Sequence, residues 1–317
     1  MNPLKTKVIR TNGNNIFIFR YIHNSVYFYR ADKNTFSPPT KVIENIWQCF
    51  SVCSNDRGIF LLCMGKDGIH LCFYDFEKWS YRLTSKNPIE NCIQISLFIY
   101  ETTVRLIYFT ANTNKIFLTS ANEKSPSVIA ESVIFKGGKA FHIGYENSVS
   151  AKIFYFLGDS LKCRSLNISN GKLSEEKTVF TTNLPCTDYS VLTAENEIHI
   201  LWLAGNSHKS MAVYKNIIKG IPSKAKVIFE NEPCKCCSLF KYKNEIYAQF
   251  IGNKNSYILN PNKNKADIFE TSDCIEKAEY MDYCSTLPLS ADEVITEDFI
   301  YFPLSETESN FLPDSDD

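Results

Sequence analysis

Residues 58–83, GIFLLCMGKDGIHLCFYDFEKWSYRL, decide the fold of this chain. They contain two strongly apolar runs, GIFLLCM (58–64) and IHLCFYDF (69–76), joined by a short turn with two glycines and an aspartate. β-Branched and aromatic residues favour strands, and a polar turn of this kind is typical of a β-hairpin. A more polar run, KWSYRL (78–83), follows a second turn. The stretch therefore predicts three consecutive antiparallel strands.

The leading apolar run returns at nearly constant intervals. Its other copies are NIFIFRYI (15–22), TVRLIYFT (103–110), AKIFYFL (151–157), EIHILWL (197–203) and EIYAQFI (245–251). The first aliphatic residues align at Ile16, Ile59, Val104, Ile153, Ile198 and Ile246, so the successive spacings are 43, 45, 49, 45 and 48 residues. A near-constant period of this length is the signature of a repeat architecture.

Each period predicts four antiparallel strands, because the run before the next repeat supplies a fourth one, such as WQCFSVC (47–53) or CIQISLF (92–98). In this pattern residues 4–304 resemble the β-propeller superfold. A pair of β-sandwiches, the competing architecture, does not predict a fixed period. We expect an all-β chain, a β-propeller with six or seven four-stranded blades. The blades are expected at 4–46, 47–90, 91–131, 132–182, 183–231 and 232–273, with a partial blade at 274–304 and an acidic disordered tail or linker at 305–317.

The amino-acid composition and net charge limit the classes of partner that we expect. Apolar residues make up 44% and aromatic residues 14% of the 317 positions, which suits a large strand-rich core. Lys and Arg total 34 against 35 for Asp and Glu, so no net field attracts nucleic acid or acidic lipids. No apolar run approaches membrane-spanning length. We therefore expect a cytoplasmic protein with no nucleic-acid partner and no membrane insertion.

Twelve cysteines raise the question of a metal, most of all in EPCKCCSLF (232–240). A structural metal site normally needs two separated pairs of Cys or His, and the five histidines form no such pair. Cys92, Cys186 and Cys234 each lie 12 residues before the aligned aliphatic residue, a place that Phe141 takes in another blade. This pattern favours apolar packing where a strand begins, with no metal and no cofactor. A thiophilic ion, redox sensing by Cys236 and Cys237, and a secreted disulfide scaffold remain alternatives.

Candidate binding residues lie in loops. With the strands of a blade labelled A to D from the inside, the B–C turns and the D–A connections should emerge on one face, and binding residues concentrate on loops of a rigid scaffold. Asn and Asp also serve tight turns for backbone reasons, whereas His is not a preferred turn residue. Trp47 could stack on a ligand, pack, or plug the channel. The candidates are His23, Trp47, Asp67, Asn112, Asp159, His208 and Lys254.

No nucleophile, metalloprotease or nucleotide-binding motif occurs in the sequence. The expected function is a non-catalytic interaction module that binds a protein or peptide through the face with the B–C and D–A loops. The alternative is a carbohydrate-binding or glycan-processing propeller that uses Asp67 and Asp159 as its acids. The tail could then be a docking motif or a linker, and the oligomeric state stays open.

Overall fold

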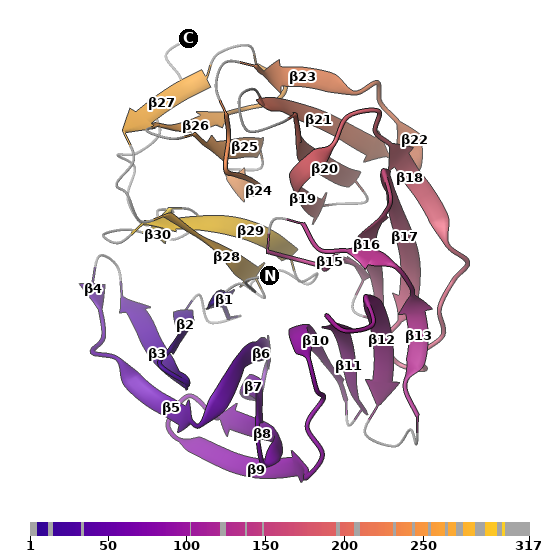
Figure 1. The fold of residues 1–317 in the computed structure, drawn as a ribbon. Helices are drawn as coiled ribbons and strands as arrows, with labels where there is room; N and C mark the ends of the chain where they lie inside the picture. The colour runs from indigo at the N-terminus through magenta and orange to yellow at the C-terminus, as the bar shows by residue number, and fades with distance from the viewer. Residues whose placement is uncertain are drawn as a thin grey trace. The chain divides into compact units, whose positions relative to one another are not determined.

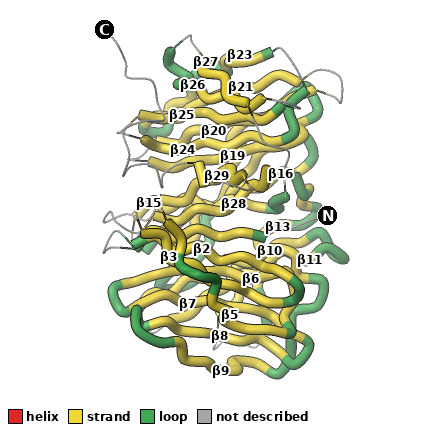
Figure 2. The backbone as a smooth tube through the Cα atoms, turned by 90° about the vertical axis from the view of Figure 1, so that its left-hand side faces the viewer, coloured by secondary structure: helices red, strands yellow, loops and turns green. Residues whose placement is uncertain are grey.

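The computed structural model consists of strands and loops in the part of the chain that it describes (Figure 2). Among these residues, no helix is long and apolar enough to cross a membrane. The chain forms two compact units, the first mainly residues 36–184 with the N-terminal segment and 280–290, the second mainly 185–279. The described residues are 5–11, 15–32, 35–101, 103–120, 125–136, 138–147, 149–194, 197–205, 210–230, 233–242, 245–252, 255–263, 266–270, 275–282, 289–296 and 300–301.

Four antiparallel sheets follow one another in the first unit, and Figure 1 lets the reader trace each from its first to its outermost strand. The first contains β1 (Thr6–Arg10), β2 (Ile16–Ile22), β3 (Ser25–Asp32), β4 (Thr35–Phe36) and β5 (Thr40–Glu44). The second contains β6 (Ile46–Asn55), β7 (Gly58–Gly65), β8 (Gly68–Tyr74) and β9 (Trp79–Ser85). The third contains β10 (Cys92–Tyr100), β11 (Thr103–Thr110), β12 (Lys115–Ser120) and β13 (Ser127–Ala130). The fourth contains β14 (Val133–Ile134), β15 (Phe141–Asn147), β16 (Ser150–Leu157), β17 (Ser160–Asn167) and β18 (Lys177–Thr181).

The second unit contains two further sheets of the same design. One consists of β19 (Cys186–Ala194), β20 (Glu197–Gly205), β21 (Ser210–Ile218), β22 (Ile221–Pro222) and β23 (Lys226–Phe229). The other consists of β24 (Cys236–Tyr242), β25 (Glu245–Ile251), β26 (Asn255–Leu259) and β27 (Ala266–Glu270). The final strands continue the first sheet in the order β30-β29-β28-β1, where β28 is Ile275–Asp282, β29 is Leu289–Thr296 and β30 is Ile300–Tyr301.

The repeated apolar run forms the second strand of every sheet. In β7 the side chains of Ile59, Leu61 and Cys63 have no exposed surface, and β16 buries Ile153 and Phe154 equally completely. A strand paired on both edges and covered on both faces needs such continuous apolar sequence, whereas outer strands can carry polar residues. The outermost strand β9 is accordingly mostly exposed.

Aromatic rings fill the space between the first two sheets. Trp79 stacks on Tyr74 with ring centroids 5.0 Å apart and meets Phe28 edge-on at 5.6 Å. Phe28 also lies 5.4 Å from Phe17. Each such pair contributes about 0.5–1.5 kcal/mol beyond the area that it buries. The abundance of aromatic residues therefore serves the packing of sheet against sheet.

Buried polar side chains link the first strand of one sheet to the first strand of the next. Ser51 Oγ accepts a hydrogen bond from the Leu97 amide at 3.0 Å, and Ser190 Oγ accepts one from the Leu239 amide at 3.1 Å. Asp188 Oδ2 accepts from the Cys237 amide at 2.8 Å. In the third sheet, Gln94 Oε1 accepts from the amides of Ala140 and Phe141. These links give partners to amides at the edge of the first strands.

Arg105 provides a second link within the first unit, from the third sheet to the fourth. Its Nε donates to the carbonyl of Ile168 at 2.6 Å, and its terminal nitrogen donates to that of Ser169 at 3.0 Å. Gly171 completes the turn that presents these carbonyls, with φ at +76°. A Cβ at position 171 would lie 2.5 Å from the guanidinium, so glycine is required there for space as well as for conformation.

Replacing Gly171 by Ala tests this link. Gly158→Ala is the matched control, because Gly158 lies in the same sheet at φ +55° and has open space around its Cα. The control should lose only the cost of a left-handed alanine, about 1 kcal/mol. Gly171→Ala should lose about 1–3 kcal/mol more, because the buried guanidinium must leave its carbonyls. Urea unfolding measures both, and equal losses would contradict the close approach.

Candidate functional site

The B–C turns and D–A connections share one end of their sheets, as predicted, and backbone hydrogen bonds hold them together. In each pair, an amide in one kind of loop, or in the strand end beside it, donates to a carbonyl in the other. The pairs are Ile46 to Asn24 at 3.1 Å, Ala111 to Asn91 at 2.9 Å, Thr182 to Asp159 at 2.9 Å and Gly205 to Pro185 at 3.1 Å. The turn end of each of these sheets is therefore braced by its own backbone.

The first B–C turn consists of His23 and Asn24, both exposed and both with left-handed backbone, at φ 47° and 60°. Asn tolerates this conformation well, and His is several-fold enriched there relative to most residues. Asn24 Oδ1 accepts a hydrogen bond from Tyr21 Oη at 2.9 Å. The turn thus has a backbone role, and it presents the His23 ring to solvent.

Asp67 in the second B–C turn pairs with His70. The carboxylate oxygen lies 2.9 Å from His70 Nε2, and the side chains of Asp67 and His70 are 68% and 21% exposed. This hydrogen bond lowers the pKa of the Asp67 carboxyl below its usual value, so the group is an anion at neutral pH. A Cβ on Gly65 would lie 2.8 Å from the same carboxylate and 2.9 Å from the Asn45 carbonyl. Two acceptors therefore lie so close to Gly65 that any larger residue there would meet both.

His70 was not predicted from the sequence. Asp67 and His70 are three positions apart across the two-residue turn between paired Gly65 and Gly68. The spacing in GKDGIH could have identified the pair, because it places an acidic turn residue close to a histidine in the strand that follows the turn.

Trp47 lies in the run WQCFSVC (47–53) that the sequence predicts as a strand, and packing is one of the three roles left open for it. It lies inside β6, within the irregular pairing between Ile46 and Phe50, rather than in a free connection. Its ring is half-buried and packs against the apolar core. The extra residues of a bulge rotate a side chain away from the regular alternation, which explains how a tryptophan at the start of a strand comes to pack inward.

The remaining candidates are dispersed. Asn112 and Asp159 are exposed in the third and fourth B–C turns. Asp67 and Asp159, the predicted acid pair, belong to different sheets, and no hydrogen bond joins them in the described part of the chain. His208 and Lys254 lie outside the described residues.

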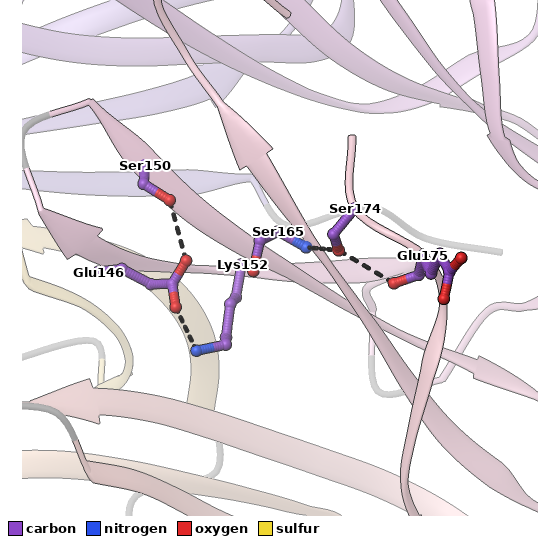
Figure 3. Close-up of polar contacts among 6 residues, drawn as sticks. All are labelled: Glu146, Ser150, Lys152, Ser165, Ser174 and Glu175. Carbon is purple, nitrogen blue, oxygen red and sulfur yellow. Dashed lines mark hydrogen bonds and ion pairs between the residues drawn. The ribbon is translucent and has the colours of Figure 1, made fainter. Parts of the chain in front are cut away.

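The opposite end of the sheets carries polar clusters that the sequence did not predict. In the fourth sheet, Glu146 accepts hydrogen bonds from Lys152 Nζ and from Ser150 Oγ, the latter at 2.9 Å (Figure 3). Burial raises the pKa of the Glu146 carboxyl, but these bonds and the nearby Ser165 outweigh it and lower that pKa overall. The cluster is a neutralised ion pair that braces the β15–β16 hairpin.

The third position of the second strand recurs in these clusters. It is Arg105 in β11, Lys152 in β16, His199 in β20 and Tyr247 in β25. Each side chain bonds to a carbonyl or carboxylate close to it, and Tyr247 Oη donates to Glu245 at 3.0 Å. In these four strands, the residue at this position therefore binds a nearby carbonyl or carboxylate.

His199 has partners on both ring nitrogens. Nδ1 lies 2.6 Å from Tyr214 Oη, and Nε2 lies 3.3 Å from a Glu197 carboxylate oxygen. Burial lowers the pKa of His199 to about 4, and the Lys241 ammonium acts in the same direction. The Glu197 carboxylate opposes this shift but is itself partly exposed, so its attraction is screened. The neutral ring then accepts from Tyr214 and donates to Glu197.

The cysteines are distributed as core residues. Cys92 and Cys186 are buried, and each Sγ donates to the carbonyl two residues later at 3.4 Å. Cys234 differs, since it is half-buried and precedes β24. Cys49 Sγ lies 3.3 Å from Cys92 Sγ, between two neighbouring first strands. Within the described residues, no group of three or more His, Cys, Asp or Glu side chains could hold a metal ion.

Replacing His70 by Ala should raise the pKa of Asp67 toward its ordinary value, because the hydrogen bond that stabilises the carboxylate is lost. Carbon-detected NMR titration of the Asp67 carboxyl measures this shift. Asp75, whose pKa is lowered by the backbone amides of Lys78 and Glu77, is an internal control that should not move. An unchanged Asp67 titration would contradict the pairing.

The free energy of unfolding should fall at acidic pH, because the buried His199 ring must then take up a proton. Its folded pKa lies below the unfolded value of 6.5, so the stabilisation is complete above pH 6.5 and is lost as pH falls toward 4. The full loss is about 3 kcal/mol. His199→Gln keeps an acceptor for Tyr214 without a titrating ring and should flatten the pH dependence of the unfolding free energy over this range. Parallel curves for the two proteins would contradict the assignment.

No protein-family model matches the chain, and no curated protein matches it in sequence. Solved structures match its fold. The BBS1N structure in complex with ARL6DN gives a TM-score of 0.54 at 10% identity, over 92% of this chain and 91% of that chain. The fucose-specific lectin from Aleuria aurantia gives 0.51 at 11% identity, over 84% and 95%. The β-propeller domain of Cps50 (Swd1) from Myceliophteria thermophila gives 0.50 at 10% identity, over 92% and 97%.

At these identities the likeness concerns the fold alone. The sequence supports the same fold, because its apolar runs recur with a period near 46 residues and each period forms one antiparallel unit. The chain has the β-propeller fold, with six or seven blades.

Proposed function

We propose that the chain is a non-catalytic interaction module that binds a protein or peptide partner through the end of the sheets formed by the B–C turns and D–A connections. The observation that carries the proposal is the brace between these two kinds of loop, exemplified by the Asn24 carbonyl and the Ile46 amide. A surface whose backbone is held in place loses little conformational entropy when a partner binds.

The side chains on this surface suit polar recognition. Asp67 is an exposed anion oriented by His70, while His23 is exposed in the first B–C turn and Asp159 in the fourth. A carboxylate with a fixed orientation accepts hydrogen bonds from backbone amides or pairs with Lys or Arg of a partner. The proposed partner therefore presents donors or basic groups to the Asp67–His70 pair.

The same residues fit glycan processing less well. A general acid needs a raised pKa so that it is protonated at neutral pH, whereas the pKa of Asp67 is lowered. Trp47, the expected stacking platform, is half-buried against the core. A catalytic role for Asp67 and Asp159 is therefore not proposed, and glycan binding becomes an outcome of the test.

The test compares the intact protein with a variant whose turns keep their geometry. His23→Asn, Asp67→Asn and Asp159→Asn remove the ring and both charges, while Asn retains the turn preference. The control is Lys172→Ala with Glu175→Ala, two exposed positions in the β17–β18 connection. Affinity capture from lysate of the source organism, a glycan array and a glycoside hydrolysis screen are run on all three proteins.

A protein captured by the intact chain and the control, but not by the turn variant, would support the proposal, and its affinity measured with purified partner should fall at least about tenfold. Capture that all three proteins share would contradict the proposed surface. Glycan binding or hydrolysis that the turn variant loses would replace the proposal with the carbohydrate-active function.

A further inference from the structure

The hairpin of β21 and β22 exposes two large apolar side chains at its tip. Ile218 and Ile221 are directly paired across the strands and are 41% and 73% exposed. Paired residues lie on the same face of a two-stranded ribbon, so the two side chains form one apolar surface. Single exposed apolar residues are normal, but a pair at a protruding tip requires a reason.

Basic residues surround this tip. The segment 198–229 contains five lysines and no aspartate or glutamate, although the chain as a whole has a net charge of −1. Lys219 and Lys224 are exposed, and neither forms an ion pair within the described part of the chain. The carboxylate closest in register is Glu197, opposite Ile218, which accepts a hydrogen bond from the neutral His199 ring and keeps its charge. At the tip itself, two exposed lysines, Lys219 and Lys224, therefore outnumber the single nearby carboxylate of Glu197.

The hairpin is rigid at its base. Lys219 and Gly220 form its turn with left-handed φ angles of 49° and 81°. The Asn216 amide donates to Ser223 Oγ at 3.1 Å, and the Ser223 amide donates to the Asn216 carbonyl at 2.8 Å. The apolar tip and its charges are thus displayed in one arrangement at the outermost strand of the sheet (Figure 1).

The composition of the tip selects the kind of partner. The cores of protein interfaces are depleted of lysine, and Pro222 removes an amide that strand addition by a peptide would need. Aliphatic side chains ringed by lysines instead suit the boundary between lipid headgroups and acyl chains, where lysines contact acidic phosphates. A bilayer also accepts a convex tip without a complementary groove.

We propose that the β21–β22 hairpin is a peripheral docking surface for a bilayer that contains acidic phospholipids. Ile218 and Ile221 enter the interface, and Lys219 and Lys224 lie against the headgroups. This surface departs from the expectation drawn from net charge. It is separate from the B–C turns, so its failure would leave the proposed interaction module untouched.

The test is sedimentation of the full chain with vesicles of phosphatidylcholine alone or with about 30% phosphatidylserine. Three variants accompany the intact protein: Ile218→Ser with Ile221→Ser, Lys219→Glu with Lys224→Glu, and the control Lys172→Glu with Lys177→Glu. The control makes the same change in net charge at two exposed lysines of the fourth sheet. Unfolding midpoints establish that each variant is folded.

Binding to the acidic vesicles alone, weaker at high salt and reduced about tenfold or more by both hairpin variants but not by the control, would support the proposal. Absence of binding by the intact protein, or equal loss in the control, would overturn it. Self-association that both hairpin variants abolish, without vesicle binding, would show that the tip is a contact between copies and would also overturn it.

Discussion

The amides at the free edges of the inner strands impose the constraint on which the rest of the structure depends. A buried amide without a partner costs about 1–3 kcal/mol, and the inner strands β10, β15 and β24 have no neighbouring strand of their own sheet on one side. Ser51, Gln94, Asp188 and Ser190 answer this need from the preceding sheet, and all four are buried. Because the second, third and fifth sheets each supply acceptors to the sheet that follows, packing and polar satisfaction require the same spacing between the sheets of these pairs.

That spacing has consequences at both ends of the sheets. At one end, backbone hydrogen bonds join the B–C turns to the D–A connections. At the other end, the third residue of four second strands finds a carboxylate or carbonyl, as Arg105 does at Ile168. The first end is left with exposed side chains such as His23 and Asp67, whereas in the fourth sheet the second end pairs its charges, as Glu146 does with Lys152. This asymmetry is why the first end is the better candidate for recognition.

The repeat period and the presence of β-strands could be predicted, because both depend on the pattern of apolar residues along short stretches of sequence. All six apolar runs are second strands, yet their alignment contained one error. The hairpin pairing makes Ala151, not Ile153, equivalent to Val104 and Ile198. A shift by two residues preserves the alternation of a strand, so apolar pattern alone cannot detect it. The comparison of Phe141 with the aligned cysteines rested on that shift and does not hold.

The site could be predicted less well, because its decisive contacts join distant residues or depend on irregular geometry. The turn positions of Asp67 and His23 follow from local chemistry. The inward packing of Trp47 depends on a bulge, and the link from Arg105 to Ser169 spans 64 positions. No periodicity reports such a contact. The sequence therefore predicts which loops share one end of the sheets more reliably than it predicts the contacts that their side chains make.

The distribution of cysteines makes the opening of individual sheets observable. Five successive sheets each contain at least one described thiol, from Cys53 in the second to Cys237 in the sixth. Burial raises the pKa of the Cys53 thiol and of the Cys63 thiol, so neither reacts while its sheet is closed. Half-buried Cys234 and Cys236 offer the most accessible sulfurs of this set. Alkylation rates resolved by peptide would then rank the sheets by their local unfolding free energies, with no label introduced into the chain.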